Sequence, residues 1–256
     1  MIRISTLASS SKGNAAVVST GNTHLLIDTG ISALRIRKGL AECGLSVKDI
    51  DGVLYTHEHS DHLCGLGVLA KKDTLSIYCS RYLSRDLQAI APSAKLHYIE
   101  PGCAFEVGDI TITPIEVSHD AADPLGYLFQ QGDDKLGYIT DTGRITRSMR
   151  HLLSGVQALY LESNYDPQML QDSGRPYDII ERIAGDWGHL SNAQAAEVVA
   201  TVAHEELRHI ILGHISPECN TPETALSSMQ EAVKTLGLAA QVYVAPQSYR
   251  LDWVEI

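Results

Sequence analysis

The sequence predicts an α/β fold in which helices cover one or more β-sheets. Short strand-like runs dominate the first half of the chain, strands and helices alternate in the second half, and no internal repeat interrupts them. With 256 residues, of which 44 % are hydrophobic, the chain can bury a full core. We expect residues 1–256 to form a single domain.

Turn-forming Ser, Gly and Asn residues separate the expected strands of the first half. The expected helix at 32–43 ends before Gly44, which readily adopts the left-handed conformation that stops a helix. The predicted strands of this half are residues 2–7, 15–20, 24–28, 52–55, 75–79, 104–107, 110–117, 126–130 and 135–140, and the predicted helices are residues 32–43, 61–71 and 81–90.

The second half alternates between helical and strand-like periodicity, which indicates sheets covered by helices. The predicted helices are residues 145–153, 177–183, 192–204 and 222–236, and the predicted strands are residues 158–162, 209–213, 241–244 and 249–254.

Composition argues against several classes of protein. No window approaches the roughly 18 consecutive apolar residues of a membrane span, and the N-terminus lacks the pattern of a signal peptide, so we expect a cytoplasmic protein without a membrane partner. A net charge of −11 counts against a broad nucleic-acid footprint but leaves room for a local basic cleft. Five scattered cysteines without a CxxC pair argue against a disulfide scaffold. No obligate protein partner is evident.

Three imidazoles and a carboxylate lie within six residues, at His57, His59, Asp61 and His62. They follow the apolar run 52–55, where a strand end and a helix start bring alternate side chains together. Nitrogen and oxygen donors of this kind suit zinc, manganese or iron. A set without thiolates favours a catalytic metal site with an open position over a closed structural site.

Four further polar residues each end an apolar run: Asp28, His119, Asp141 and His214. Any one of them alone is more often a turn or cap residue. Together with the histidine cluster they form a set, because strands deliver such residues to one edge of a sheet.

This ordered set resembles the metallo-β-lactamase superfamily, with an early Asp, HxHxDH, a His, a bridging Asp and a late His. The resemblance implies a four-layer αββα sandwich, two β-sheets flanked by helices, with two divalent metal ions (zinc, manganese or iron) at one edge. It further implies that one ion is bound by His57, His59 and His119, that the other is bound by Asp61, His62 and His214, that Asp141 bridges them, and that Asp28 orients a ligand.

Members of this superfamily that hydrolyse β-lactams usually carry Cys where this chain has Asp141, so the resemblance disfavours that activity. A carboxylate favours an oxygen-bridged metal pair, as in phosphodiester and some thioester hydrolases. A hydroxide shared by ions about 3.5–4 Å apart would then attack phosphorus. The leaving oxygen also needs a proton donor.

Glu162 and His189 are candidates for that donor. Glu162 ends an apolar run, and His189 precedes a helix whose expected cap is Ser191. A carboxylate beside this imidazole would fix its tautomer. The order of these segments resembles the tRNA 3′-processing nucleases and related phosphodiesterases, and we predict Asp61, Glu162 and His189 as catalytic residues.

The loop at residues 7–15 resembles the YycJ/WalJ group of bacterial metallo-hydrolases, as do segments around His119, Glu162 and residues 242–246. The resemblance implies a 5′→3′ exonuclease acting on DNA ends. Lys12 stands where that group more usually has a small residue. The candidate substrate contacts are Ser10, Lys12, Asn14 and Arg144.

Three alternatives remain open from the sequence. A glyoxalase II-type thioester or lactone hydrolase can share the seven ligands, and the phosphodiester could belong to RNA or to a small molecule. A non-catalytic binding module is the third, although every ligand position is filled.

Overall fold

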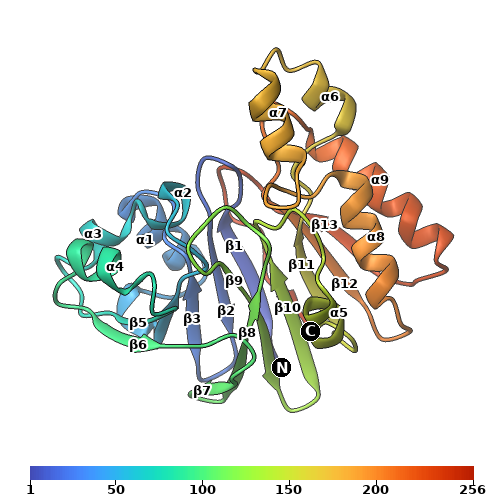
Figure 1. The fold of residues 1–256 in the computed structure, drawn as a ribbon. Helices are drawn as coiled ribbons and strands as arrows, with labels where there is room; N and C mark the ends of the chain where they lie inside the picture. Colours follow the sequence, from blue (N-terminus) through green and yellow to red (C-terminus); the bar gives the residue numbers. More distant parts are fainter.

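The computed structural model describes residues 1–256 and contains two seven-stranded β-sheets packed face to face, with helices on both outer faces (Figure 1). The predicted four-layer αββα sandwich is therefore confirmed. No helix is long and apolar enough to span a bilayer.

Sheet A has the strand order β14-β1-β2-β3-β4-β5-β6. Its last four strands are mutually parallel, and the other neighbours are antiparallel. Its strands are β1 (Arg3–Ala8), β2 (Ala15–Ser19), β3 (His24–Ile27), β4 (Gly52–Leu54), β5 (Ser76–Cys79), β6 (Lys95–Tyr98) and β14 (Val254–Glu255).

Sheet B has the order β13-β12-β11-β10-β9-β8-β7. Its first four strands are parallel and the others antiparallel, so the two sheets have matching patterns. Its strands are β7 (Phe105–Val107), β8 (Ile110–Glu116), β9 (Leu125–Gln131), β10 (Asp134–Ile139), β11 (Ala158–Glu162), β12 (His209–Gly213) and β13 (Gln241–Val244).

Four helices and a 3₁₀ turn lie in the first half of the chain: α1 (Ala33–Glu42), η1 (Val47–Asp49), α2 (Ser60–Leu63), α3 (Leu66–Leu69) and α4 (Ser84–Ile90). Five helices lie in the second half: α5 (Arg147–Leu152), α6 (Pro167–Gln171), α7 (Tyr177–Ala184), α8 (Asn192–Val202) and α9 (Pro222–Thr235). In Figure 1 the first group lies on the sheet A side and the second on the sheet B side.

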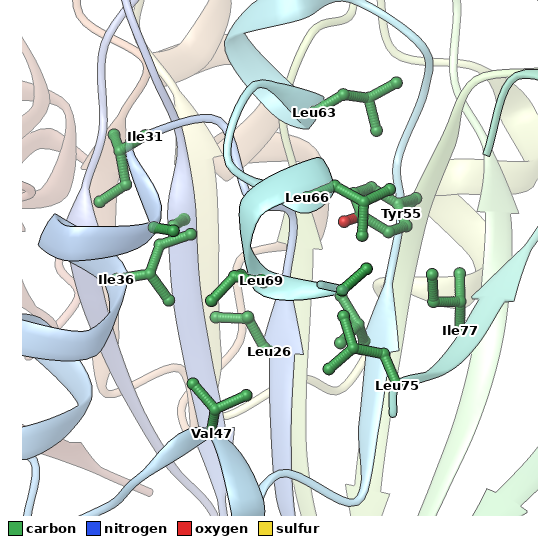
Figure 2. Close-up of a cluster of buried hydrophobic side chains, with 14 of the residues drawn as sticks. Leu26, Ile31, Ile36, Val47, Tyr55, Leu63, Leu66, Leu69, Leu75 and Ile77 are labelled. Carbon is green, nitrogen blue, oxygen red and sulfur yellow. The ribbon is translucent and has the colours of Figure 1, made fainter. Parts of the chain in front are cut away.

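Three large apolar clusters separate the layers. The first packs α1, α3 and α4 against sheet A through residues such as Leu26, Ile36 and Leu69 (Figure 2). A second fills the space between the sheets, where the rings of Tyr138 and Tyr160 stack with centroids 4.2 Å apart. The third packs α5, α8 and α9 against sheet B. Both faces of each sheet are thus covered, as parallel strands require.

Several predicted elements need correction. The continuous helix expected at residues 61–71 is wrong: α2 and α3 are separate, with Gly65 between them. The Gly65 amide donates to Thr29 O at 2.8 Å, and a β-carbon there would lie 2.3 Å from Ile31 O. This close approach to the β3–α1 segment redirects the chain.

The strand expected at residues 249–254 is also wrong, because only Val254 and Glu255 pair with β1. Three elements were not predicted: β6, α6 and the short 3₁₀ turn η1. The four residues of β6 are all at least partly exposed, and the strand is too short to show a clear pattern. The α6 signal was present: Asp166 caps the helix and Pro167 is its first residue.

The topology explains why one edge of the molecule gathers polar residues. The parallel strands β3 and β4 end at the same edge of sheet A, as do β10, β11 and β12 in sheet B. β8 runs in the direction of β10, because each is antiparallel to β9. The candidate residues that end or follow these strands therefore lie at this edge: Asp28, His57, His119, Asp141, Glu162 and His214.

Candidate metal centre

The predicted metal ligands converge where these strands end. The ring nitrogens of His57, His59 and His119 form one group of donor atoms that all lie within 4.8 Å of one another. Donor atoms of Asp61, His62 and His214 form a second such group, and Asp141 forms one with His57 and His62. The two triads are those that the resemblance implies, with Asp141 adjacent to both.

Strained backbone directs three of these side chains. Asp28, Asp141 and His214 have φ values of 57°, 50° and 52°, in the left-handed region that non-glycine residues rarely adopt. Each such residue costs roughly 1–3 kcal/mol, and such strain clusters at functional sites. Asp28 and His214 directly follow strands and Asp141 is the second residue after β10, so all three stand where strands end at the shared edge.

Two neighbouring loops hold the histidine motif. The Asn14 amide donates to Asp61 O at 2.8 Å, and Gly30 N donates to Asn14 O at 2.7 Å. Thr29 N donates to His62 O at 2.8 Å. The segments after β1 and β3 thus fix the backbone of the motif before any side chain takes part.

Asp28 lies behind the cluster, as predicted. Its Oδ2 lies 2.8 Å from His62 Nδ1, and both side chains are fully buried. Burial opposes a charge on His62, but the carboxylates of Asp28 and Asp141 outweigh it and raise its pKa to about 10. The Asp28 contact occupies Nδ1 and leaves Nε2 facing the donor cluster.

Thr56 takes part in the same arrangement and was not predicted. Its amide donates to Asp28 Oδ1 and its hydroxyl to Asp28 Oδ2, both at 2.9 Å. The hydroxyl oxygen also lies 3.0 Å from His57 Nδ1 and 3.1 Å from His62 Nδ1. Its position directly before His57 was the only signal in the sequence.

The cluster contains buried polar atoms that no protein group satisfies. His57 Nε2 and His214 Nε2 are buried without a hydrogen-bond partner, and the nearest carboxylate to His214 Nδ1 is that of Asp141, at 2.9 Å. Although burial opposes charge on Asp141, His214 and His62 keep its pKa well below the usual range, so it is a carboxylate. Buried polar groups normally find partners. Imidazole nitrogens and carboxylate oxygens that converge without them fit divalent-ion binding.

Glu162 and His189 meet beside this cluster. Glu162 ends β11 and is fully buried, and its Oε2 accepts from His189 Nδ1 at 3.0 Å. Burial opposes charge on Glu162, but His189 lowers its pKa and keeps it ionised. His189 Nδ1 also lies 3.7 Å from Asp141 Oδ1, so the pair borders the donor cluster directly.

The candidate substrate contacts differ in exposure. Ser10 and Asn14 are buried, and Ser10 N donates to Asn14 Oδ1. Asn14 Nδ2 lies 3.1 Å from His62 Nε2 and 3.4 Å from Asp61 Oδ2, so it borders the donor cluster. Lys12 is exposed.

Arg144 is half-exposed, and its Nη1 lies 3.4 Å from Asp186 Oδ2. Two other residues near the site were missed. Ser9 accepts a hydrogen bond from His214 N at 2.7 Å, and Asp120 Oδ1 lies 3.4 Å from His119 Nε2. Asp120 directly follows its histidine in the sequence, but nothing in the sequence signals the contact between Ser9 and His214, which joins residues 205 positions apart.

Comparisons with known proteins agree with this geometry. Residues 23–215 match the family model "Beta-lactamase superfamily domain". The exodeoxyribonuclease YycJ of Bacillus anthracis is 36 % identical over 239 residues, which cover 92 % of this chain and 90 % of that protein. The exodeoxyribonuclease WalJ of Streptococcus pneumoniae serotype 2 is 34 % identical over 255 residues, covering 94 % and 93 %.

Among solved structures, the metallo-β-lactamase fold protein YhfI of Bacillus subtilis superposes with a TM-score of 0.75 at 15 % identity, covering 98 % of this chain and all of that one. The likeness at this identity concerns the fold alone. With full-length relatives above 30 % identity and a family model that spans most of the chain, this protein belongs to the β-lactamase superfamily and, within it, to the group of YycJ and WalJ.

Proposed function

We propose that this protein is a dinuclear metal-dependent phosphodiester hydrolase that degrades DNA from 5′ ends. Its relatives YycJ and WalJ are named exodeoxyribonucleases, and the similarity extends over nearly the whole length of both chains. The structural observation that carries the proposal is the His189–Glu162 pair, 3.0 Å apart beside the donor cluster.

In this proposal His57, His59 and His119 hold one ion, Asp61, His62 and His214 hold the other, and Asp141 lies between them. A bound pair of divalent ions would supply an activated water and offset charge on the phosphate. The chain itself keeps the donors in place through Asp28 and Thr56. The ions can be zinc, manganese or iron, since imidazole and carboxylate donors suit all three.

His189 is proposed to pass a proton to the leaving oxygen. Glu162 accepts from Nδ1, which fixes the ring orientation and leaves Nε2 free to exchange a proton with substrate. The ring is 20 % exposed, whereas Glu162 is fully buried, so only the histidine can reach a bound phosphodiester. Asp61 Oδ2 lies 3.4 Å from His62 Nε2 and 3.7 Å from His214 Nε2, so it is proposed to act as a metal ligand that shapes the reaction site.

A digest of end-labelled substrates tests the proposal. The metal-loaded protein should shorten 5′-labelled DNA to labelled mononucleotides or very short products from the first time points. The 3′ label should remain on long fragments at those times. Faster digestion of RNA, or release from the 3′ label first, would contradict a 5′ DNA exonuclease.

Replacement of His189 separates a phosphodiesterase from a thioester hydrolase. A positioned general acid contributes about 10²–10⁴-fold to rate. His189→Ala should therefore slow DNA hydrolysis by about 100-fold or more, and slow bis(p-nitrophenyl) phosphate far less, because that leaving group needs no proton. Equal losses on both substrates would remove the leaving-group role. Steady-state kinetics on both substrates, with metal content measured for each protein, make the comparison.

A further inference from the structure

The rim of the metal centre carries some cations that are paired with carboxylates and others that are not. On the sheet B side, Arg144 pairs with Asp186 and Arg182 Nε lies 2.5 Å from Asp120. A phosphate that approaches these arginines must compete with a carboxylate already in place. Arg175, on the same side, is held by an acidic partner as well.

The sheet A side is different. Lys12, in the loop after β1, and Arg35, in the first turn of α1, are exposed and form no ion pair. They belong to adjoining segments, because Gly13 packs on the chain that leads into α1: a β-carbon on Gly13 would lie 2.7 Å from the Ile31 side chain. The unpaired cations Lys12 and Arg35 thus lie in or next to the loop after β1, whose Asn14 donates to Asp61 O.

A hydrogen-bonded segment connects Arg35 to the metal centre. Gln247 Nε2 donates to Ile215 O at 3.3 Å, directly after His214, and Gln247 O accepts from Arg35 Nη2 at 3.5 Å. The loop after β1 and the chain after β13 lie side by side (Figure 1), and Ser9 N donates a hydrogen bond to Pro246 O at 3.1 Å. Hydrogen bonds through Gln247 therefore connect the segment that follows His214 to Arg35.

An aromatic ring lies at the far end of this surface. Tyr249 is 69 % exposed and, with Arg35, Lys38 and Arg250, lines a cavity of about 110 Å³. Glu42 is the one carboxylate that lines it, and it lies 3.8 Å from Lys38. Arg250 pairs with Asp252 at 2.6 Å, so Arg35 is the free cation of this cavity. An exposed tyrosine next to a free cation matches the needs of single-stranded nucleic acid, whose phosphates bind cations and whose bases stack on aromatic rings.

We propose that single-stranded DNA leaving the metal centre crosses the surface formed by Lys12, Arg35 and Tyr249, with phosphates on the two cations and a base on the tyrosine ring. This inference rests on the proposed exonuclease function. It assigns strand binding to the sheet A side, so the paired arginines on the sheet B side contribute little to strand binding. It also explains how a chain with a net charge of −11 can hold a polyanion.

Kinetics of the metal-loaded enzyme on a single-stranded dinucleotide and dodecanucleotide test the proposal. Tyr249→Ala and Arg35→Gln should each raise KM for the dodecanucleotide by about 5-fold or more, without a comparable rise for the dinucleotide. Lys12→Gln and Arg35→Gln should each reduce the salt dependence of binding, with the log–log slope falling by about 0.7 per lost phosphate contact.

The chain offers matched controls. Arg208 is exposed and unpaired but precedes β12, at the edge opposite the metal centre. Tyr82 is 74 % exposed and follows β5, which three strands of sheet A separate from β1. Arg208→Gln and Tyr82→Ala should leave both KM values unchanged. If the controls raise KM for the dodecanucleotide as much as Tyr249→Ala and Arg35→Gln do, the effect is a general one of charge or surface, and the proposal is overturned.

Two other outcomes would decide which rim binds the strand and whether the protein is an exonuclease. If Trp187→Ala, on the sheet B side and 59 % exposed, weakens dodecanucleotide binding while Tyr249→Ala does not, the strand crosses the other rim and the proposal is wrong. If the unmodified enzyme neither binds nor cuts DNA, the exonuclease function itself fails, and this is seen without any variant.

Discussion

Asp141 lies at the centre of the candidate site and touches most of its other members. Its Oδ1 lies 2.9 Å from His214 Nδ1, and its Oδ2 lies 3.4 Å from His62 Nε2. The side chain is almost completely buried. A buried carboxylate surrounded by imidazoles can offset the positive charge of divalent ions bound on either side of it, whereas an uncharged amide of the same shape cannot.

Asp141→Asn tests that position with little change in volume. We expect at least one ion per chain to be lost, together with DNA hydrolysis, because the central negative charge is removed while packing is kept. Metal analysis after gel filtration measures the first effect and the end-label digest the second. Asp252→Asn, at a side chain that is 95 % exposed, is the control. Full metal content in Asp141→Asn would rule out a bridging role.

Asp28 acts through His62 and not on substrate. An amide in its place keeps one acceptor for the Thr56 amide but weakens the contact to His62 Nδ1. Partners behind metal ligands typically contribute about 10–100-fold to metal affinity. Asp28→Asn should therefore weaken metal binding by that factor, as measured by competition with a chromophoric chelator, and excess metal should restore kcat. A loss that excess metal does not restore would point to a direct catalytic role.

At the scale of elements, the site depends on close backbone contacts between loops. Gly30 follows β3, and a β-carbon at this position would lie 1.5 Å from Asp61 O. Gly213, at the end of β12, packs on the Tyr160 ring in the same way, with Tyr160 OH 2.0 Å from the site of a β-carbon. These glycines let the segments that carry metal ligands touch their neighbours.

Gly30→Ala should destabilise both the fold and the metal centre. The methyl group forces the β3–α1 segment away from the histidine motif, and overpacking of this kind costs about 1–3 kcal/mol. Urea denaturation gives the free energy of unfolding, and metal content reports on Asp61 and His62. Gly21→Ala, in a turn with nothing within 4 Å of a β-carbon, should change neither value. Equal stability of the two variants would contradict the contact.

At the scale of the whole molecule, the two sheets meet at the site. His57, His59, Asp61 and His62 lie on segments that follow sheet A, and the other three proposed ligands follow strands of sheet B. No disulfide joins the layers, since all five cysteines are free. The inter-sheet apolar cluster and hydrogen bonds such as that between Ser9 Oγ and Tyr160 OH hold the halves together, and the proposed metal centre would add to them.

Bound metal should then stabilise the whole protein. Ligands that bind only the folded state at 100 times their Kd add about 2.7 kcal/mol to the free energy of unfolding. Removal of metal with EDTA should lower Tm in thermal unfolding followed by circular dichroism, and added Zn²⁺ or Mn²⁺ should restore it. His189→Ala should show the same EDTA shift if this residue is not a ligand. An unchanged Tm after verified metal removal would contradict the link between the sheets.

Local patterns in the sequence predicted most elements and the seven proposed ligands, but not Thr56, Ser9 or Asp120 beside them. The alternation of apolar and polar residues located the strands, and each proposed ligand outside the histidine motif was recognised because it ends an apolar run. Residues 61–71 and 249–254 were predicted wrongly because contacts with distant segments decide them: Gly65 packs on residues 29–31, and Leu251 N donates to Thr6 O. Periodicity contains no information about such contacts.

By itself, the sequence identified the residues that gather at the candidate metal centre, because HxHxDH and the polar residues that follow it stand where predicted strands end. The tertiary structure alone decided how those residues are held and what surrounds them. It placed Asp28, Asp141 and His214 in left-handed backbone, and it brought Thr56 against three site residues at once. It also paired Arg144 with Asp186 while leaving Arg35 free beside Tyr249. The reason is physical: spacing along the chain fixes side-chain direction, whereas burial, strain and charge pairing depend on segments that meet only when the chain folds.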